Sequence, residues 1–87
     1  MKHAGPDALA ELAGLLDQLR TVDGLVEKRP GVFSRRSRAA LHFHEDPSGL
    51  YADVRLDPSA ADFERVLVTT PAQQARLVRG VRAALRP

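Results

Sequence analysis

The residues best suited to chemistry lie on two short stretches, 41–45 and 50–56, in which apolar and polar residues alternate. A period of two is typical of half-buried β-strands. Residues 46–49 between them read Asp-Pro-Ser-Gly, a composition typical of a turn, because proline fixes φ and glycine allows positive φ. The pattern predicts a β-hairpin whose polar face carries the candidate ligand-binding residues His42, His44, Tyr51, Asp53 and Arg55.

The register of this hairpin follows from the need to keep its two faces matched. A slip of one residue would move every side chain to the opposite face of the sheet. The favoured register places His42 opposite Asp53 and His44 opposite Tyr51. Directly opposed residues have Cβ atoms about 4.5–5.5 Å apart. We therefore expect one imidazole beside a carboxylate and a second beside a phenol.

Three kinds of site are consistent with this polar face. His42 and His44 could begin a zinc, iron or manganese site, with Asp53 as a third ligand or as the carboxylate that orients His42. The pair of His42 and Asp53 could instead serve in acid–base catalysis. In the third alternative the polar residues simply face water, leaving a surface for an anionic small molecule or a protein partner.

Length and composition restrict the class of protein. With 87 residues the chain is expected to form one domain, 1–87, and the lack of cysteine excludes disulfides and Cys-ligated zinc. No apolar run approaches the roughly 20 residues of a membrane span, and the first residues lack the apolar core of a signal peptide. We expect a cytoplasmic monomer or homodimer with no membrane partner and no cofactor, unless a divalent metal binds.

The elements before the hairpin are indicated by periodicity. Residues 1–6 are expected to be frayed. An apolar stripe predicts a helix over 8–20 that begins after the N-cap Asp7. Short strands are expected over 25–29, 32–35 and 38–45. Arg36 and Ser37 would form a tight turn, although neither residue favours positive φ.

The elements after the hairpin complete the fold class. Residues 57–62 are expected to connect to a strand over 63–69. Thr70, Pro71 and Gln73 match a capping box with proline at the first position of a final helix. Strands in sequence with helices at the ends indicate an α+β domain, with four to five antiparallel strands and both helices packed on one face.

The densest basic cluster, which consists of Arg29, Arg35, Arg36 and Arg38, suggests a second function. Arg35, Arg36 and Arg38 surround the expected tight turn and are the candidates for contact with nucleic acid. A solvated loop tip is the favoured interpretation, because the formal net charge of the whole chain is only +2. Nucleic-acid binding is therefore possible but not favoured.

Residues 38–56 resemble the small bacterial luciferase-like domain family of unknown function. Its members carry an L/F-H-x-H-type strand and a D-x-R-L-type strand, matched here by His42, His44, Asp53, Arg55 and Leu56. The resemblance does not imply light emission. The order of elements is also similar, more distantly, to MmcQ/YjbR-like α+β domains, to which a DNA-binding role is sometimes given.

The sequence thus favours a ligand-binding or protein-binding accessory module over an enzyme. The alternatives are a metal-binding protein or metal-dependent enzyme that uses His42, His44 and Asp53, and a weak nucleic-acid binder.

Overall fold

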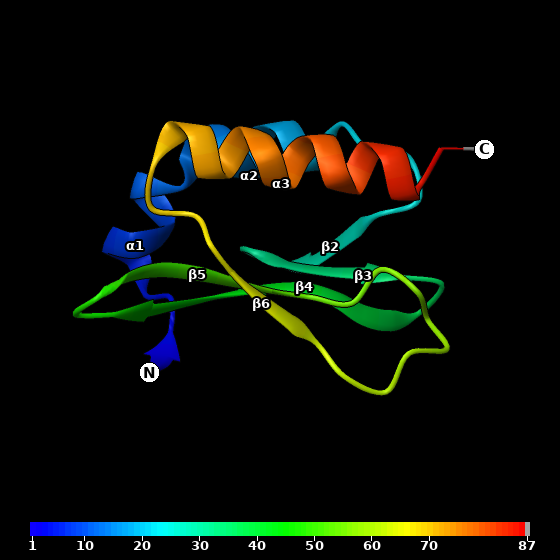
Figure 1. Ribbon diagram of the computed structural model, residues 1–87, viewed down its shortest axis with the longest axis horizontal. Helices are drawn as coiled ribbons and strands as arrows, with labels where there is room; N and C mark the ends of the chain where they lie inside the picture. The colour runs from blue at the N-terminus through cyan, green and yellow to red at the C-terminus, as the bar shows by residue number, and fades with distance from the viewer. Residues whose placement is uncertain (87) are drawn as a thin grey trace.

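An antiparallel sheet covered on one face by helices makes up residues 1–86, the part of the chain that this computed structural model describes (Figure 1). The helices are α1 (Pro6–Glu11), α2 (Ala13–Arg20) and α3 (Pro71–Ala84). The strands are β1 (Lys2–His3), β2 (Val26–Arg29), β3 (Val32–Arg35), β4 (Arg38–Asp46), β5 (Gly49–Val54) and β6 (Glu64–Leu67). The α+β class with terminal helices is confirmed. No helix among the described residues is both long and apolar enough to cross a membrane.

The sheet has the strand order β2-β3-β4-β5-β6, and β1 adds to β4 as well. The first half of the nine-residue β4 pairs with β3, and its last residues pair with β1. The predicted hairpin register is confirmed, because His42 lies opposite Asp53 and His44 opposite Tyr51. The long central strand therefore presents its two histidines near the middle of the sheet.

The core lies between the apolar face of the sheet and the helices α2 and α3, which lie side by side above it (Figure 1). Alternation along each strand sends one set of side chains toward the helices and the other set toward the opposite face. The fully buried side chains include Leu12, Leu15, Leu19, Phe33, Leu41, Val68 and Val81.

The start of α3 confirms the predicted capping box. Thr70 Oγ1 accepts a hydrogen bond from the Gln73 amide at 3.2 Å, and Gln73 Oε1 accepts one from the Thr70 amide at 3.0 Å. Pro71 occupies the first helical position, where its missing N–H is not needed. This cap fixes the point at which the chain leaves β6 and crosses to the helical layer.

The expectation of a frayed chain over residues 1–6 is wrong. Lys2 and His3 form β1, the Ala4 amide donates to the Phe43 carbonyl at 3.0 Å, and the Gly5 amide donates to Glu45 Oε2 at 2.7 Å. Pairing with a distant strand leaves no periodic signal in so short a segment, so the sequence could not indicate it. Gly5, not Asp7, is the N-cap of the first helix, and Pro6 is its first residue.

The single helix expected over 8–20 is divided into α1 and α2 at Leu12. The Leu12 amide lies 3.1 Å from the Ala8 carbonyl and 3.2 Å from the Leu9 carbonyl, so the turn tightens there. The apolar stripe continues across the bend, since Leu12 itself is fully buried. Periodicity alone therefore could not distinguish one helix from two.

The predicted turn at Arg36 and Ser37 is confirmed, and both residues have positive φ, at 50° and 67°. Two consecutive left-handed residues match the right-handed twist of the strands on either side.

The last strand is shorter than the expected 63–69, since β6 extends only over Glu64–Leu67. Val68 still donates to the Leu50 carbonyl at 2.8 Å, but the chain then turns toward α3.

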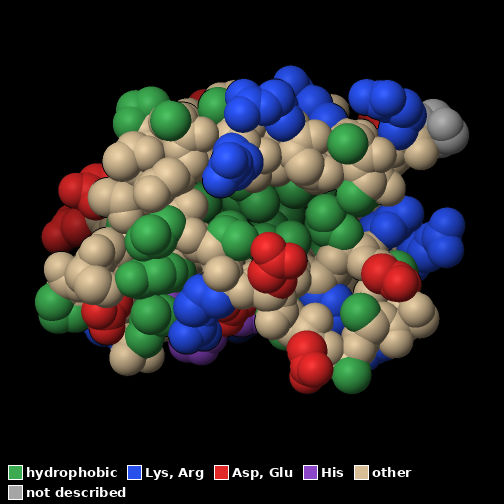
Figure 2. Space-filling view, in the orientation of Figure 1, with side chains coloured by type: hydrophobic (Ala, Val, Ile, Leu, Met, Phe, Trp, Pro, Cys, Tyr) green, Lys and Arg blue, Asp and Glu red, His purple; other side chains and the backbone are tan. Residues whose placement is uncertain are grey.

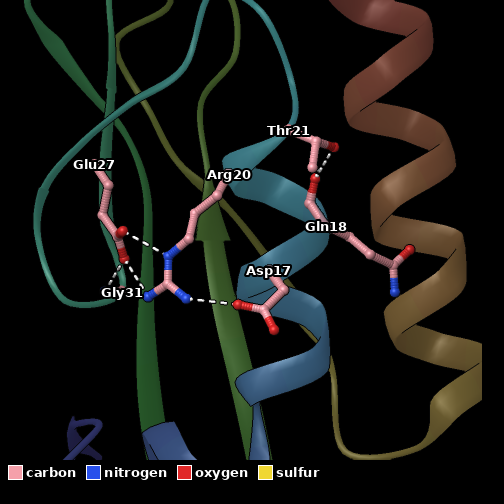
Figure 3. A network of polar contacts seen from close by, with 6 residues as sticks. All are labelled: Asp17, Gln18, Arg20, Thr21, Glu27 and Gly31. Carbon is pink, nitrogen blue, oxygen red and sulfur yellow. Dashed lines mark hydrogen bonds and ion pairs between the residues drawn. The ribbon is translucent and has the colours of Figure 1, made fainter.

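A polar network joins α2 to β2 (Figure 3). The Arg20 guanidinium donates to both carboxylate oxygens of Glu27, at 2.7 Å and 2.9 Å, and to Asp17 Oδ1 at 2.9 Å. Glu27 Oε2 also accepts the Gly31 amide at 3.0 Å. These hydrogen bonds, with that from Arg20 first, lower the pKa of Glu27. Glu27 therefore fixes both the end of α2 and the turn after β2.

We expect Glu27→Gln to lower the free energy of unfolding at pH 7 by at most about 1 kcal/mol, the upper range for exposed ion pairs. The folded-state pKa lies below the unfolded value, so the stabilisation is complete above the ordinary glutamate pKa and is lost as pH falls through the folded value. The difference between wild type and variant should therefore shrink between pH 7 and pH 3. Urea denaturation at both pH values measures it, and a difference that grew in acid would contradict this account.

A hollow remains between α3 and β6 on the helical side of the sheet, visible as a green recess in Figure 2. It has a volume of about 540 Å³ and is walled mainly by apolar side chains, with Glu64 and Arg76 also lining it. Val54 and Val66, which line the hollow, alternate along their strands with Asp53 and Arg65. The hollow therefore lies on the opposite face from the histidines.

Candidate metal site

All three histidines of the chain meet on the face of the sheet opposite α2 and α3. One ligand nitrogen from each of His3, His42 and His44 lies within 4.8 Å of the others. The ring centroids of His3 and His44 are 4.6 Å apart, and those of His42 and His44 are 5.1 Å apart. Three nitrogen donors this close together are a candidate metal-binding cluster.

Strand pairing positions each of these rings. His42 and His44 are two residues apart on β4 and so project to the same face. His3 lies directly opposite His44 in the pairing of β1 with β4. The cluster therefore depends on one local feature, the alternation of β4, and on one distant feature, the addition of β1.

A partly buried ion pair lies next to the cluster. Arg65 donates to Asp53 through two parallel hydrogen bonds, from Nε to Oδ1 at 2.7 Å and from Nη2 to Oδ2 at 2.9 Å. The two residues are opposed in the pairing of β5 with β6. The side chain of Arg65 is half exposed, whereas Asp53 is only 6% exposed. The guanidinium therefore neutralises a carboxylate that water scarcely reaches, and these hydrogen bonds lower the pKa of Asp53.

The same carboxylate faces both histidines of β4. Asp53 Oδ2 lies 3.2 Å from His44 Nδ1 and 3.8 Å from His42 Nδ1. Both Nδ1 atoms are buried, and within residues 1–86 neither has an aligned hydrogen-bond partner. A nearby carboxylate favours the tautomer with the proton on Nδ1, which leaves Nε2 of each ring as the donor to a metal.

Burial lowers the pKa of both His42 and His44, because desolvation of the imidazolium outweighs the attraction of Asp53. Both rings are therefore neutral at pH 7. Neutral imidazole is the form that binds transition metals, so protons compete little with a metal at neutral pH. His3 is exposed and lies at the outer edge of the cluster.

An aromatic ring lies against His42, and a guanidinium lies over that aromatic ring. The ring centroid of Phe63 lies 4.9 Å from that of His42, and the Arg55 guanidinium carbon lies 4.3 Å from the Phe63 centroid. Arg55 also donates from Nη2 to the Ala39 carbonyl at 2.9 Å. This stack shields His42 from water and explains part of its burial.

The structure brings together only some of the predicted site residues. His42, His44 and Asp53 adjoin one another, but the Tyr51 hydroxyl pairs with Ser48 Oγ at 2.7 Å and Arg55 stacks on Phe63. The alternative in which the polar residues of this face simply face water is wrong for His44 and Asp53, which are 9% and 6% exposed. The added β1 and the side chains next to His44 cover it.

Two of the three arginines proposed for nucleic-acid contact are used within the fold. Arg35 Nη1 donates to the Leu56 carbonyl at 2.5 Å, and Arg38 Nη1 donates to the Pro58 carbonyl. These bonds attach the irregular segment after β5 to the β3–β4 hairpin. Arg36, at the tip of that hairpin, is exposed.

Sequence reasoning missed His3, Phe63 and Arg65. The only available signal for His3 was that the chain has three histidines in all, of which two were already placed on one strand face. Arg65 is on the same face as Asp53 once β6 pairs with β5, but the order of strands cannot be obtained from periodicity. The Asp53 carboxylate is consequently held by Arg65 and lies beside the two rings.

The three histidines could hold an ion if their ligand nitrogens moved closer together. Zinc–nitrogen bonds of 2.0–2.1 Å would place tetrahedral ligand nitrogens about 3.3 Å apart, which requires the rings to close by about 1.5 Å from their largest spacing. His3, on the two-residue strand β1, is the exposed member of the cluster. Comparisons with protein-family models, with curated proteins and with solved structures found no match to this chain, so any function must be argued from this geometry.

Proposed function

We propose that this protein is a binding module whose ligand is a divalent transition-metal ion of the zinc type, held by His3, His42 and His44. The observation that carries the proposal is the convergence of all three histidines, from strands far apart in sequence, to within 4.8 Å. Three imidazoles are a donor set suited to Zn²⁺, and also to Co²⁺, Ni²⁺ or Cu²⁺, and ill suited to Mg²⁺ or Ca²⁺.

The surroundings of the three rings support the same proposal. Ligating histidines commonly direct their second ring nitrogen at a carboxylate, which orients the ring and makes it a stronger ligand. Asp53 Oδ2 lies 3.2 Å from His44 Nδ1, in the position of such a carboxylate. Arg65 holds Asp53 in place through two hydrogen bonds. The proposal thus assigns Asp53 a positioning role behind the ligands.

Titration of the protein with Zn²⁺ at pH 7, followed by calorimetry, tests the proposal. We expect saturable binding of one ion, and no binding by the triple variant His3→Ala/His42→Ala/His44→Ala. Because two of those residues are shielded, His3→Ala alone is the second variant, since its side chain is exposed and its loss should leave the fold intact. It should weaken binding at least tenfold, the lower range for loss of an outer-shell partner.

The controls for this experiment are nearby. Lys2→Ala changes an exposed neighbour of His3 on the same strand and should bind Zn²⁺ like wild type. Thermal unfolding of each variant without added metal shows whether it is folded. Wild-type protein that does not bind Zn²⁺, or His3→Ala that is folded and binds it equally well, would refute the proposed site.

A further inference from the structure

We propose that the metal site also binds a small carboxylate with a short apolar tail, in a pocket that adjoins the histidines. This inference rests on the proposed function, since the carboxylate would bind to the metal held by His3, His42 and His44. The carboxylate head would contact the metal and Arg29, and the tail would lie against the apolar wall of the pocket.

The pocket and the cluster share two residues. An open pocket of about 490 Å³ is lined by His3 and His42, by the turn between β2 and β3, and by Leu9 of α1. It lies where β1 and β3 leave a gap along β4, because β3 pairs with one part of that strand and β1 with another. Pockets of this size accommodate small ligands. A metal held by the cluster would thus adjoin the pocket.

The charges of the lining favour an anion. Arg29 is the charged side chain that lines the pocket, and no acidic residue among residues 1–86 does so. Arg29 also has no ion-pair partner within the described part of the chain. Three neutral imidazoles leave the full double charge on a bound metal, and three protein ligands leave at least one coordination position open. An anion would therefore meet positive charge on two sides.

The remaining wall of the pocket is mainly apolar. Leu9, Val32 and Phe43 line it. Gly31 has a φ of +76°, and a Cβ added there would lie 2.7 Å from Leu9 Cδ2 and 3.7 Å from Phe43 Cδ2. A side chain at this position would clash with the end of the Leu9 side chain, and it would make an ordinary van der Waals contact with Phe43. An apolar wall beside a positively charged residue suits an acid with a short hydrocarbon tail more than phosphate.

Cobalt offers a test that separates this inference from the proposed function. Co²⁺ replaces Zn²⁺ in nitrogen sites, and its visible spectrum changes when a ligand enters its coordination sphere. We expect saturable spectral changes when the Co²⁺-loaded protein is titrated with butyrate. Acetate, which lacks two CH₂ groups, should bind up to about 15-fold more weakly, the effect of burying both. Phosphate should bind more weakly than butyrate.

The variants are Arg29→Gln and its matched control Lys28→Gln, which removes the same charge one residue away on β2 but outside the pocket lining. We expect Arg29→Gln to bind Co²⁺ like wild type and butyrate at least fivefold more weakly, and Lys28→Gln to match wild type for both. If the protein binds Co²⁺ but butyrate does not change the Co²⁺ spectrum, the carboxylate pocket alone is overturned. The same holds if Arg29→Gln and Lys28→Gln change the affinity for butyrate equally. Equal binding of acetate, butyrate and phosphate would overturn the role of the apolar wall, and failure to bind Co²⁺ would overturn both proposals.

Discussion

Replacing Asp53 with asparagine should weaken Zn²⁺ binding about 10–100-fold and lower the free energy of unfolding by about 1.5–3 kcal/mol. The carboxylate accepts two hydrogen bonds from Arg65 and faces both imidazoles of β4. An asparagine retains the size of the side chain but presents an N–H₂ group where one acceptor stood, and it removes the negative charge behind the metal. Calorimetry with Zn²⁺ and urea denaturation without added metal measure the two effects.

Arg65→Gln is the variant that separates these effects. It also breaks the ion pair and should lower stability, but it leaves the Asp53 carboxylate beside the histidines without its guanidinium. A metal cation then interacts with an unshared negative charge, so we expect Zn²⁺ to bind more tightly than to wild type. If Asp53 only stabilised the fold, Asp53→Asn and Arg65→Gln would not be expected to change the affinity for Zn²⁺ in opposite directions. Loss of affinity in both variants would contradict the positioning role.

Phe33→Ala should lower the free energy of unfolding by about 3–5 kcal/mol, as expected for removal of a buried aromatic ring. Phe33 is 1% exposed and lies in β3, opposite Leu41 of the central strand. A loss of this size is a large fraction of the total of about 5–15 kcal/mol that is typical of small domains. The midpoint of urea denaturation should therefore fall sharply at unchanged pH.

Val26→Ala is the matched control for Phe33→Ala, because Val26 lies in the neighbouring strand β2 but is 54% exposed. We expect it to change the free energy of unfolding by less than about 0.5 kcal/mol. A Phe33→Ala variant as stable as Val26→Ala would mean that the ring does not belong to the core between the sheet and the helices.

The hairpin of β4 and β5 could be predicted from the sequence down to its register. Alternation along both strands and the turn at residues 46–49 determine which side chains share a face, and both are local properties. The cap of α3 could be predicted for the same reason, since Thr70 and Gln73 interact across a single turn. These elements needed no knowledge of the rest of the fold.

The complete site could not be predicted, because it depends on pairings between distant segments. His3 joins the cluster only when β1 adds to β4, and Arg65 reaches Asp53 only when β6 adds to β5. Neither pairing leaves a periodic signal, since β1 has two residues and β6 has four. The carboxylate that the sequence offered as a ligand therefore proved to be held by a guanidinium.

The addition of β1 to β4 has a consequence for the order of folding. Closing the short loop between β4 and β5 costs less chain entropy than bringing His3 to His44, 41 residues away, so the hairpin should form well before β1 docks. His42 and His44 would then be arranged early, and the third histidine would arrive last. The rate at which β1 docks and detaches would set the rate at which the cluster forms and separates. An ion bound to His3 and to the two histidines of β4 would slow the detachment of β1.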